Sequence, residues 1–357
     1  MTIEFEPPVN SSINDRLVYV VSDTDATNTA LSNYQYVADV YVNSVMVHRC
    51  KSYPNPTNNM GEFELSEILR DYISYSFKAE QGAGEFSLAV TVKFGEEYDG
   101  TLYVDLATSA VTFFNCYNGR IGSETYIENY INLPATDRPR SVQMVVGQDE
   151  YYVPYYAYSS SPFTVTINGT STTVTPTAAK TMHRINIAAP SATSNYTAVI
   201  NGVTFNVELL CNGLYTNYYL HFLNQWGGWE SFLFNKPRRQ KFSVERKQFQ
   251  KLPYRVSAGG DATIHTDNVI HQQRVNFGQS FSEKLSLKTD WLKDAEWEWL
   301  KQLILSPLVY MQKQGSDTMY PVILNTNDYE VKEYVVDQLT QLTIEVEFGT
   351  RYNTQTA

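Results

Sequence analysis

"FTVTINGTSTTV" at residues 163–174 and "YTAVINGVTFNV" at residues 196–207 decide the fold class. Each stretch places an Asn-Gly pair between two runs in which apolar and polar residues alternate. Asn and Gly tolerate the positive φ angles of a two-residue hairpin turn, and alternation is typical of a strand with one buried face. The two stretches therefore predict two antiparallel β-hairpins.

Strand pairing follows from the position of each turn. We expect these cross-strand partners: Phe163 with Val174, Val165 with Thr172, Ile167 with Thr170, Tyr196 with Val207, Ala198 with Phe205, and Ile200 with Val203. One face of each hairpin is apolar, which predicts a small antiparallel sandwich or barrel, inserted as a domain over residues 141–211. The likeness of the two stretches is explained by hairpin chemistry, although an internal repeat stays an alternative.

The composition is that of a folded globular chain. Of 357 residues, 43% are hydrophobic and 18% are charged, and this length predicts two or three domains. Tyrosine is unusually abundant at 27 residues. Its stiff apolar ring with a polar tip suits half-buried strands and subunit interfaces, and also sugar-binding surfaces.

Charge and cysteine content indicate an intracellular protein without a framework of disulfides. The net charge of -11 disfavours general binding to nucleic acid or membranes. Cys50, Cys116 and Cys211 are widely spaced, so we expect reduced thiols and synthesis in a cytoplasm. The sequence predicts neither a signal peptide at its N-terminus nor a membrane-spanning helix.

Residues 1–112 predict an N-terminal β domain with a short helix. Ser66 is the expected cap of this helix, and four apolar residues would share one of its faces: Ile68, Leu69, Tyr72 and Ile73. Strands are expected over 17–21, 34–42, 85–94 and 101–106, where β-branched and aromatic residues gather. Residues 113–140 form a connecting segment, read either as one short helix ended by Pro134 or as an ordered loop.

Residues 212–357 predict a C-terminal mixed β domain with a long helix over 290–305, capped by Thr289 or Asp290. Its apolar stripe contains Leu292, Ala295, Trp299, Leu300, Leu303 and Ile304. Trp291 and Trp297 fall off this stripe and are expected to be partly exposed. Apolar and polar residues alternate over 342–348, as in a strand with one face exposed to solvent. The whole chain is therefore predicted to be mainly β, a β-rich α+β protein with antiparallel sheets or sandwiches and two amphipathic helices.

The segment "LNQWGGWESFLFNKPRRQKF" at residues 223–242 predicts a hairpin that is apolar on both faces. Gly227 and Gly228 allow a two-residue turn that would set Trp226 opposite Trp229. A hairpin of this kind must be covered on both sides. A hairpin in the core is the favoured interpretation; an interface between protomers and a stacking platform for a sugar are the alternatives.

Residues 236–255 carry eight Lys and Arg against the single Glu245, a net charge of +7 that leaves -18 on the remainder. Phe242, Val244 and Phe249 interrupt the basic residues, as in a strand with one buried edge. The segment is read as a solvated or internally paired face, as a contact with an acidic neighbouring protein, or as a contact with DNA phosphates.

The sequence predicts no catalytic, cofactor-binding or metal site. His265, Asp267 and His271 do not have an established ligand spacing, and "SDTDATN" at 22–28 lacks the length of a calcium loop. His48 and Cys50 would form a nucleophile and base only in a bent strand. Paired carboxylates for glycoside hydrolysis are not selected by any pattern.

Three longer stretches resemble virion proteins of tailed phages that infect Bacteroidetes, including the crAss-like phages. They are "YVADVYVNSVMVHRCKSYPNPTNNMGEFELSEILRDY" (36–72), "YLHFLNQWGGWESFLF" (219–234) and "SPLVYMQKQGSDTMYPVILNTNDYEVKE" (306–333). The likeness covers about half of the chain and leaves the Asn-Gly hairpins outside it. It implies a non-enzymatic structural protein of the tail or head-to-tail connector, assembled in the host cytoplasm as a ring around the DNA conduit.

The implied partners are copies of the chain itself and other tail or connector proteins, with DNA in the channel as a further candidate and no membrane span. A carbohydrate-binding or receptor-binding β-sandwich protein is the alternative function. The residues expected at subunit interfaces are Trp226, Trp229, Phe232, Phe234, Arg238, Arg239, Lys241, Arg246, Lys247, Trp291 and Trp297.

Overall fold

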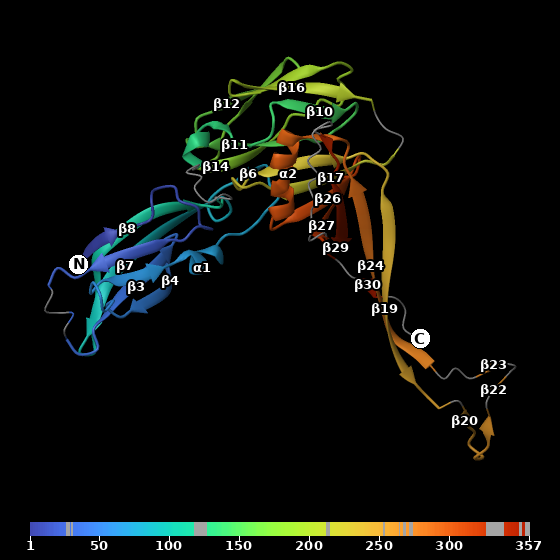
Figure 1. Ribbon diagram of the computed structural model, residues 1–357, viewed down its shortest axis with the longest axis horizontal. Helices are drawn as coiled ribbons and strands as arrows, with labels where there is room; N and C mark the ends of the chain where they lie inside the picture. The colour runs from blue at the N-terminus through green and yellow to red at the C-terminus, as the bar shows by residue number, and fades with distance from the viewer. Residues whose placement is uncertain are drawn as a thin grey trace. The chain divides into compact units, whose positions relative to one another are not determined.

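A computed structural model describes most of the chain (Figure 1). The described residues are 1–25, 29, 31–117, 127–211, 215–252, 254–263, 265–266, 269–270, 274–325, 339–349 and 352–353. The chain is mainly β, with 53% of its residues in strands and 7% in helices. The predicted fold class is therefore confirmed.

The chain divides into two compact units. Unit 1 contains Met1–Asn212, His221–Phe232 and Ala295–Pro307, and unit 2 contains Gly213–Leu220, Leu233–Asp294 and Leu308–Ala357. The N-terminal, connecting and Asn-Gly hairpin regions predicted from sequence thus fall in one unit. Most of the long helix also belongs to unit 1, although it lies within the region predicted as the C-terminal domain.

The N-terminal part of unit 1 is a β-sandwich. One sheet has the order β1-β2-β5, formed by Thr2–Phe5, Val18–Ser22 and Gly61–Glu64. The other has the order β4-β3-β7-β8, formed by Val45–Ser52, Gln35–Val42, Ser87–Tyr98 and Thr101–Phe114. Inward residues of both sheets form one core, in which the ring of Phe94 lies 5.5 Å from Tyr19 and 5.9 Å from Phe63. The strands predicted in this region are confirmed.

The short helix α1 spans Ser66–Arg70 and buries Leu69 against this core. Its N-cap is Leu65, and no side chain caps it, so the prediction that Ser66 is the cap is wrong. Glu64 instead accepts hydrogen bonds from the backbone N–H groups of Ser66 and Leu17, at 3.0 and 3.3 Å. The Glu64 carboxylate thus satisfies the N–H of the first helical residue, one of the groups that has no partner within a helix.

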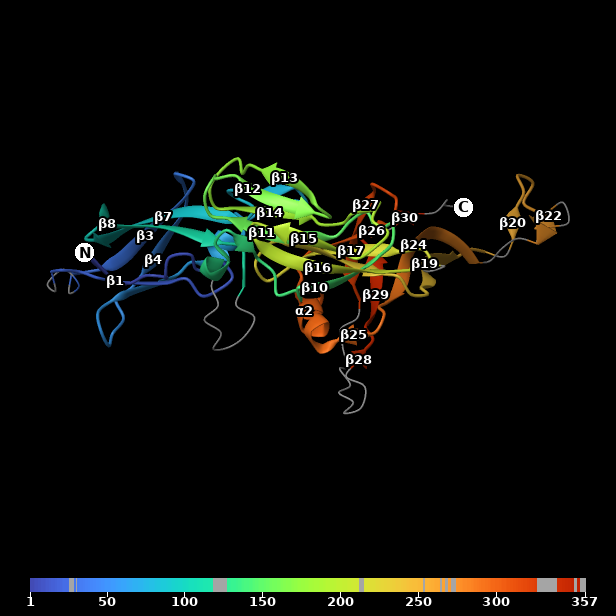
Figure 2. The same ribbon diagram turned by 90° about the horizontal axis from the view of Figure 1, so that it is seen from above.

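A second β-sandwich completes most of unit 1 (Figure 2). Its five-stranded sheet has the order β10-β16-β15-β12-β13, formed by Ser141–Val145, Val203–Leu210, Tyr196–Ile200, Phe163–Ile167 and Thr170–Val174. Its four-stranded sheet has the order β6-β14-β11-β9, formed by Glu80–Gln81, Thr181–Asn186, Tyr152–Ala157 and Leu133–Pro134. Both sheets contribute to one core. Because β6 comes from residues 80–81, the 141–211 region shares a sheet with the N-terminal region.

Both Asn-Gly hairpins are confirmed, including all six predicted cross-strand partners. The φ angles are 47° and 81° at Asn168 and Gly169, and 47° and 85° at Asn201 and Gly202. Two consecutive positive φ angles are the geometry that the pair was expected to adopt. One pair in this sheet departs from the antiparallel prediction, since β10 runs parallel to β16. In the connecting segment, Ile127–Tyr130 forms a 3-10 helix, while residues 118–126 lie outside the described residues.

The hairpin of β17 (Tyr218–Leu223) and β18 (Trp229–Phe234) turns differently from the prediction. The turn runs from Asn224 to Gly228, closed by a 2.9 Å bond from Asn224 N–H to Gly228 C=O. The Asn224 side chain also accepts from the N–H groups of Trp226 and Gly228, each at 3.0 Å. Trp226 therefore lies in the turn rather than opposite Trp229, because the Asn224 side chain organises a longer turn than two glycines require.

The two glycines are needed for close approach of other segments of unit 1. A Cβ on Gly228 would lie 2.2 Å from Cβ of Pro154. A Cβ on Gly227, where φ is 77°, would lie 2.0 Å from the carbonyl oxygen of Asn115. The Gly-Gly pair is thus a packing requirement of the core.

Unit 2 contains sheet strands in the order β26-β27-β29-β24-β19. The strands not yet introduced are β26 (Val309–Lys313), β27 (Met319–Leu324), β29 (Thr343–Phe348), β24 (Arg274–Lys288) and β19 (Arg239–Gln250). Short strands complete the unit: β20 (Arg255–Val256), β21 (Ala262–Thr263), β22 (His265–Thr266), β23 (Val269–Ile270), β25 (Leu292–Lys293), β28 (Leu339–Thr340) and β30 (Tyr352–Asn353). The predicted strand near the C-terminus is confirmed, with Ile344 and Val346 buried.

Helix α2 spans Asp294–Leu305, so the predicted end is correct and the predicted start at residue 290 is wrong. Leu292 belongs to β25, which pairs with β28, and Ala295 is exposed. The buried helical residues are Trp297, Trp299, Leu300, Gln302 and Leu303. The prediction that Trp297 is partly exposed is wrong, whereas Trp291 is 56% exposed. A strand in place of the first helical turn shifts which residues face the core.

We expect Gly228→Ala to lower the free energy of unfolding by about 1–3 kcal/mol, because the added methyl group would overlap Pro154 in a filled core. Gly82→Ala is the matched control, since its Cβ would meet nothing closer than Thr181 Cγ2 at 3.9 Å. Urea denaturation of both variants checks this expectation. Equal stabilities for the two would contradict it.

Candidate functional site

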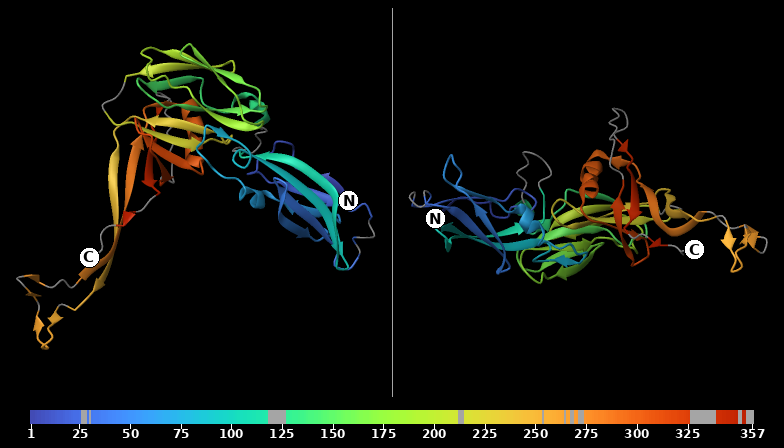
Figure 3. Two further views of the ribbon diagram at one scale, coloured as in Figure 1. Left: turned by 180° about the vertical axis from the view of Figure 1, so that it is seen from behind. Right: turned by 90° about the horizontal axis from the view of Figure 1, so that it is seen from below.

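Strand β19 and most of strand β24 form a two-stranded ribbon, here named the basic ribbon and comprising residues 239–250 and 274–286 (Figures 1 and 3). The strands pair from Arg239 with Ser286 to Gln250 with Arg274. The next strand, β29, pairs with β24 only from Lys284 to Lys288, and β30 adds a pair at Ser280 and Phe281. Every residue of β19 is exposed.

The ribbon forms because its two strands alternate apolar and polar residues over a long run. Phe242 lies opposite Glu283, and Val244 lies opposite Phe281. A bulge interrupts the register between Lys247 and Gln248. Beyond it, the rings of Phe249 and Phe277 meet at 6.0 Å. These cross-strand contacts are the local source of stability in the ribbon.

Large apolar side chains of the ribbon stay in water. Phe242 is 62% exposed, Phe277 50%, Phe249 46% and Val244 40%. The expected buried edge is therefore not formed by the folded chain. Apolar side chains gathered on an exposed surface are typical of sites that bind another molecule.

The positive charge of the ribbon is only partly balanced within unit 2. Lys241 pairs with Glu345 at 3.1 Å, and next to the ribbon Lys236 pairs with Asp290 at 2.5 Å. Arg239, Arg246 and Lys247 make no ion pair within the part of the chain that the structure describes. Internal pairing thus accounts for some of the basic segment and leaves a cationic surface.

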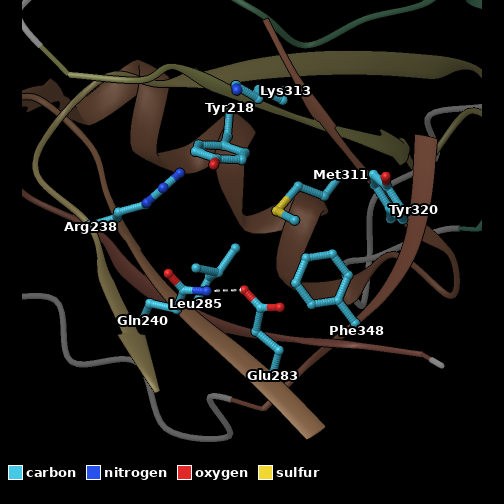
Figure 4. A pocket seen from close by; sticks show the side chains of 9 residues that line it. All are labelled: Tyr218, Arg238, Gln240, Glu283, Leu285, Met311, Lys313, Tyr320 and Phe348. Carbon is cyan, nitrogen blue, oxygen red and sulfur yellow. Dashed lines mark hydrogen bonds between the residues drawn. The ribbon is translucent and has the colours of Figure 1, made fainter. Parts of the chain in front are cut away.

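A pocket of about 270 Å³ lies at the base of the ribbon, on the sheet of unit 2 (Figure 4). Its lining residues come from β17, the segment before β19, and strands β19, β24, β26, β27 and β29: Tyr218, Arg238, Gln240, Glu283, Leu285, Met311, Lys313, Tyr320 and Phe348. The Arg238 guanidinium lies 4.8 Å from the Tyr218 ring, and Gln240 donates to Glu283. The pocket thus combines aromatic walls with two cations and one carboxylate.

A buried charge pair marks the centre of unit 1. The guanidinium of Arg138 lies between the rings of Trp299 and Tyr151, 3.8 and 4.0 Å from their centroids. Its Nε lies 3.7 Å from the Glu230 carboxylate, and its NH2 group donates to the carbonyl of Ser231. The side chains of Arg138 and Glu230 are 2% and 0% exposed.

The Glu230 carboxylate is held by donors on both oxygens. Trp299 Nε1 and Asn224 Nδ2 each donate to it at 2.6 Å. Burial raises the pKa of Glu230, and the neighbouring Arg138 opposes this rise. The pair joins β18, α2, the Asn224 turn and the segment after β9. Both side chains are almost fully buried and Arg138 packs between two core rings, so the pair is interpreted as part of the core.

The predicted interface residues fall into two groups. Trp226, Trp229, Phe234 and Trp297 are buried in the folded chain, at 2%, 0%, 1% and 5% exposure, and Phe232 is half-buried. As folded, the four buried side chains are not available to a partner or to a sugar. Arg238, Arg239, Lys241, Arg246, Lys247 and Trp291 are exposed. The favoured interpretation of the 223–234 segment as a core hairpin agrees with this burial.

Sequence reasoning named Arg238 but missed the rest of the pocket. Met311 and Tyr320 lie opposite each other on β26 and β27, far along the chain from Tyr218. No spacing pattern could have grouped them. Sequence reasoning also missed the pairing of Arg138 with Glu230, which are separated by 92 positions.

Among the described residues, no group of His, Cys, Asp and Glu could hold a metal ion. Asp267 and His271 of the sequence motif lie outside the described residues, as does part of 22–28. His48 and Cys50 lie on β4 opposite Val40 and Ala38, as alternate residues of one strand.

No protein-family model matches this sequence. A search of curated proteins also finds no match. The similarity to phage virion proteins therefore stays a prediction. Among the described helices, none has the length and apolar character needed to cross a membrane.

We expect Arg138→Met to lower the free energy of unfolding by about 3–5 kcal/mol, because it leaves the buried Glu230 carboxylate without its counter-charge. Arg140→Met is the matched control, since Arg140 is exposed and contacts the Phe205 ring at 4.6 Å. Its expected cost is below about 1 kcal/mol. Chemical denaturation measures both, and a similar cost for the two variants would refute the assigned role of Arg138.

Proposed function

We propose that this chain is a non-enzymatic structural component of a bacteriophage virion. In this proposal it assembles with copies of itself into a ring, in the tail or the head-to-tail connector, around the DNA conduit. The basic ribbon is the observation that carries the proposal. The sequence resemblance in residues 36–72, 219–234 and 306–333 gives the class of protein.

The ribbon favours an assembly role because its apolar side chains and cations stay exposed. A two-stranded ribbon is marginally stable in water unless another layer covers it. Its edge strand β19 presents unpaired backbone groups, a row of exposed phenylalanines and unbalanced cations. A neighbouring subunit would supply the missing cover. In a ring, each copy would present one surface to a different surface of the next.

The burial of four aromatic residues reduces the set of residues that the proposed contact surface can contain. Trp226, Trp229, Phe234 and Trp297 are removed from the interface, since unfolding of the core would be needed to expose them. The contact surface therefore consists of the ribbon residues Arg239, Lys241, Phe242, Val244, Arg246, Lys247, Phe249 and Phe277.

We expect the purified chain, alone or with its neighbouring tail proteins, to form cyclic oligomers visible by electron microscopy and light scattering. Arg246→Glu with Lys247→Glu should abolish the oligomers and leave the melting temperature nearly unchanged, because both side chains are exposed and make no described ion pair. A chain that stays monomeric under all these conditions and is absent from virions would refute the proposal.

DNA is the competing partner for the ribbon. If it binds phosphates, affinity for duplex DNA should fall steeply with salt, with a logarithmic slope of about -0.9 for each phosphate neutralised. Oligomers that survive the ribbon substitutions, together with loss of such DNA binding, would assign the ribbon to the conduit instead.

Carbohydrate binding is the second candidate function, and the pocket at the ribbon base favours it. Tyr218, Tyr320 and Phe348 offer aromatic walls of the kind on which sugar rings stack, beside Arg238 and Lys313. We expect glycan-array binding, if present, to be lost on Tyr218→Ala with the fold intact by circular dichroism. Binding that persists in this variant would exclude the pocket as the sugar site.

A further inference from the structure

The negative charge of the chain gathers in the N-terminal sandwich. Residues 1–114 contain 16 Asp and Glu against six Lys and Arg, a net charge of -10. Four of those six cations already form ion pairs there: Arg49 with Asp39, Lys51 with Glu97, Lys78 with Glu85, and Lys93 with Asp105. Local pairing therefore leaves most of the acidic excess without a counter-charge.

Part of this excess lies on the outer face of the β1-β2-β5 sheet. Side chains at opposed positions of an antiparallel pair share a face. Tyr19, Val21 and Phe63 point into the core, so their neighbours point outward. The outward set, here named the acidic face, is Glu4, Phe5, Val18, Val20, Glu62 and Glu64.

The acidic face resembles the ribbon with its charges reversed. Glu62 and Glu64 are exposed and lie opposite Val20 and Val18. Phe5 also lies opposite Val20 and is 53% exposed. No Lys or Arg occurs in β1, β2 or β5. Both surfaces thus combine exposed aromatic side chains with a net charge, which is negative on the acidic face and positive on the ribbon, where six Lys and Arg outnumber Glu245 and Glu283.

We propose that the acidic face of one copy receives the basic ribbon of the next copy. Glu4 and Glu62 face Arg246 across this contact, and Phe5 packs against Phe242 and Val244, which share one side of the ribbon with Arg246. The inference rests on the proposed ring and names the two surfaces that build it. It commits to a second copy because the charges are complementary and both surfaces remain exposed in the folded chain.

The two surfaces differ from each other, so the contact is head-to-tail. Each copy uses its ribbon once and its acidic face once, and repetition closes a ring or extends a filament. The charged groups lie at the surface, where salt screens their attraction. Association should therefore weaken as the salt concentration rises, with the apolar contacts supplying the residual affinity.

Charge reversal on the acidic face provides the test. Glu4→Arg with Glu62→Arg should weaken self-association at least about 100-fold, as measured by sedimentation velocity at low salt, because like charges then oppose each other. Glu64 is left intact because it bonds the start of α1. Glu208→Arg with Glu298→Arg changes the same number of charges at exposed sites elsewhere and should associate as the parent chain does.

Recombining the reversed charges identifies the contact. A chain carrying Glu4→Arg, Glu62→Arg, Arg246→Glu and Lys247→Glu together should regain self-association, since both sides are then reversed. An equimolar mixture of the two double variants should also associate, with each ribbon meeting a matching face. Equal loss of association in the Glu208 and Glu298 control would mean that net charge alone matters and would overturn the inference, as would failure of both the recombined variant and the mixture to associate.

The failures of the two proposals are distinguishable. If the parent chain forms cyclic oligomers and Glu4→Arg with Glu62→Arg leaves them intact, the ring stands and the acidic face is refuted as its docking surface. If the parent chain forms no oligomer with or without tail proteins, the ring itself fails. The named contact is supported if the variant with all four substitutions associates and neither double variant associates by itself.

Discussion

The pairing of Arg138 with Glu230 is the constraint on which the centre of unit 1 depends. An ionised group buried without a partner costs several kcal/mol, so every element that carries a hydrogen-bond donor or acceptor for this pair has to be in place at once. The Trp299 indole, the Asn224 amide and the Ser231 carbonyl reach it from α2, the hairpin turn and β18. The same turn excludes side chains at Gly227 and Gly228. Polar pairing and close packing thus fix one arrangement of segments that are distant in sequence.

The basic ribbon differs from this buried pair, because its charged and apolar side chains stay exposed. Its backbone groups pair between β19 and β24 while the outer edge of β19 stays unpaired, and the side chains of β19 are exposed. Exposure of four large apolar side chains is a cost that the isolated chain bears and that an assembled protein would recover. The Glu230 carboxylate finds its partners within the folded chain, whereas the apolar and cationic side chains of the ribbon stay exposed, as the proposed assembly requires.

Local sequence patterns predicted the positions of the strands well, but they predicted poorly which residues are buried. The Asn-Gly turns fix hairpin register because few other residues adopt two positive φ angles. The Gly-Gly pair was expected to form a two-residue turn in the same way. Its glycines are instead required by close contact with Pro154 and Asn115, which are far away in the sequence. Trp297 was expected to be exposed because it falls off a stripe drawn through Leu292 and Ala295. In the structure, Leu292 lies in β25, which pairs with β28 from a remote segment, and Ala295 is exposed. Tertiary pairing overrode the local preference in both cases.

By itself, the sequence determined the β-rich class, the two hairpins and the position of the basic segment, because turn chemistry, alternation and charge are properties of neighbouring residues. Only the tertiary structure decided which aromatic residues are buried, that Arg138 meets Glu230, and that the pocket draws its walls from six separate segments. Burial and buried pairing depend on residues that are close in space and far apart in the chain. The ribbon needed both: the sequence supplied its charge, and the fold left it uncovered.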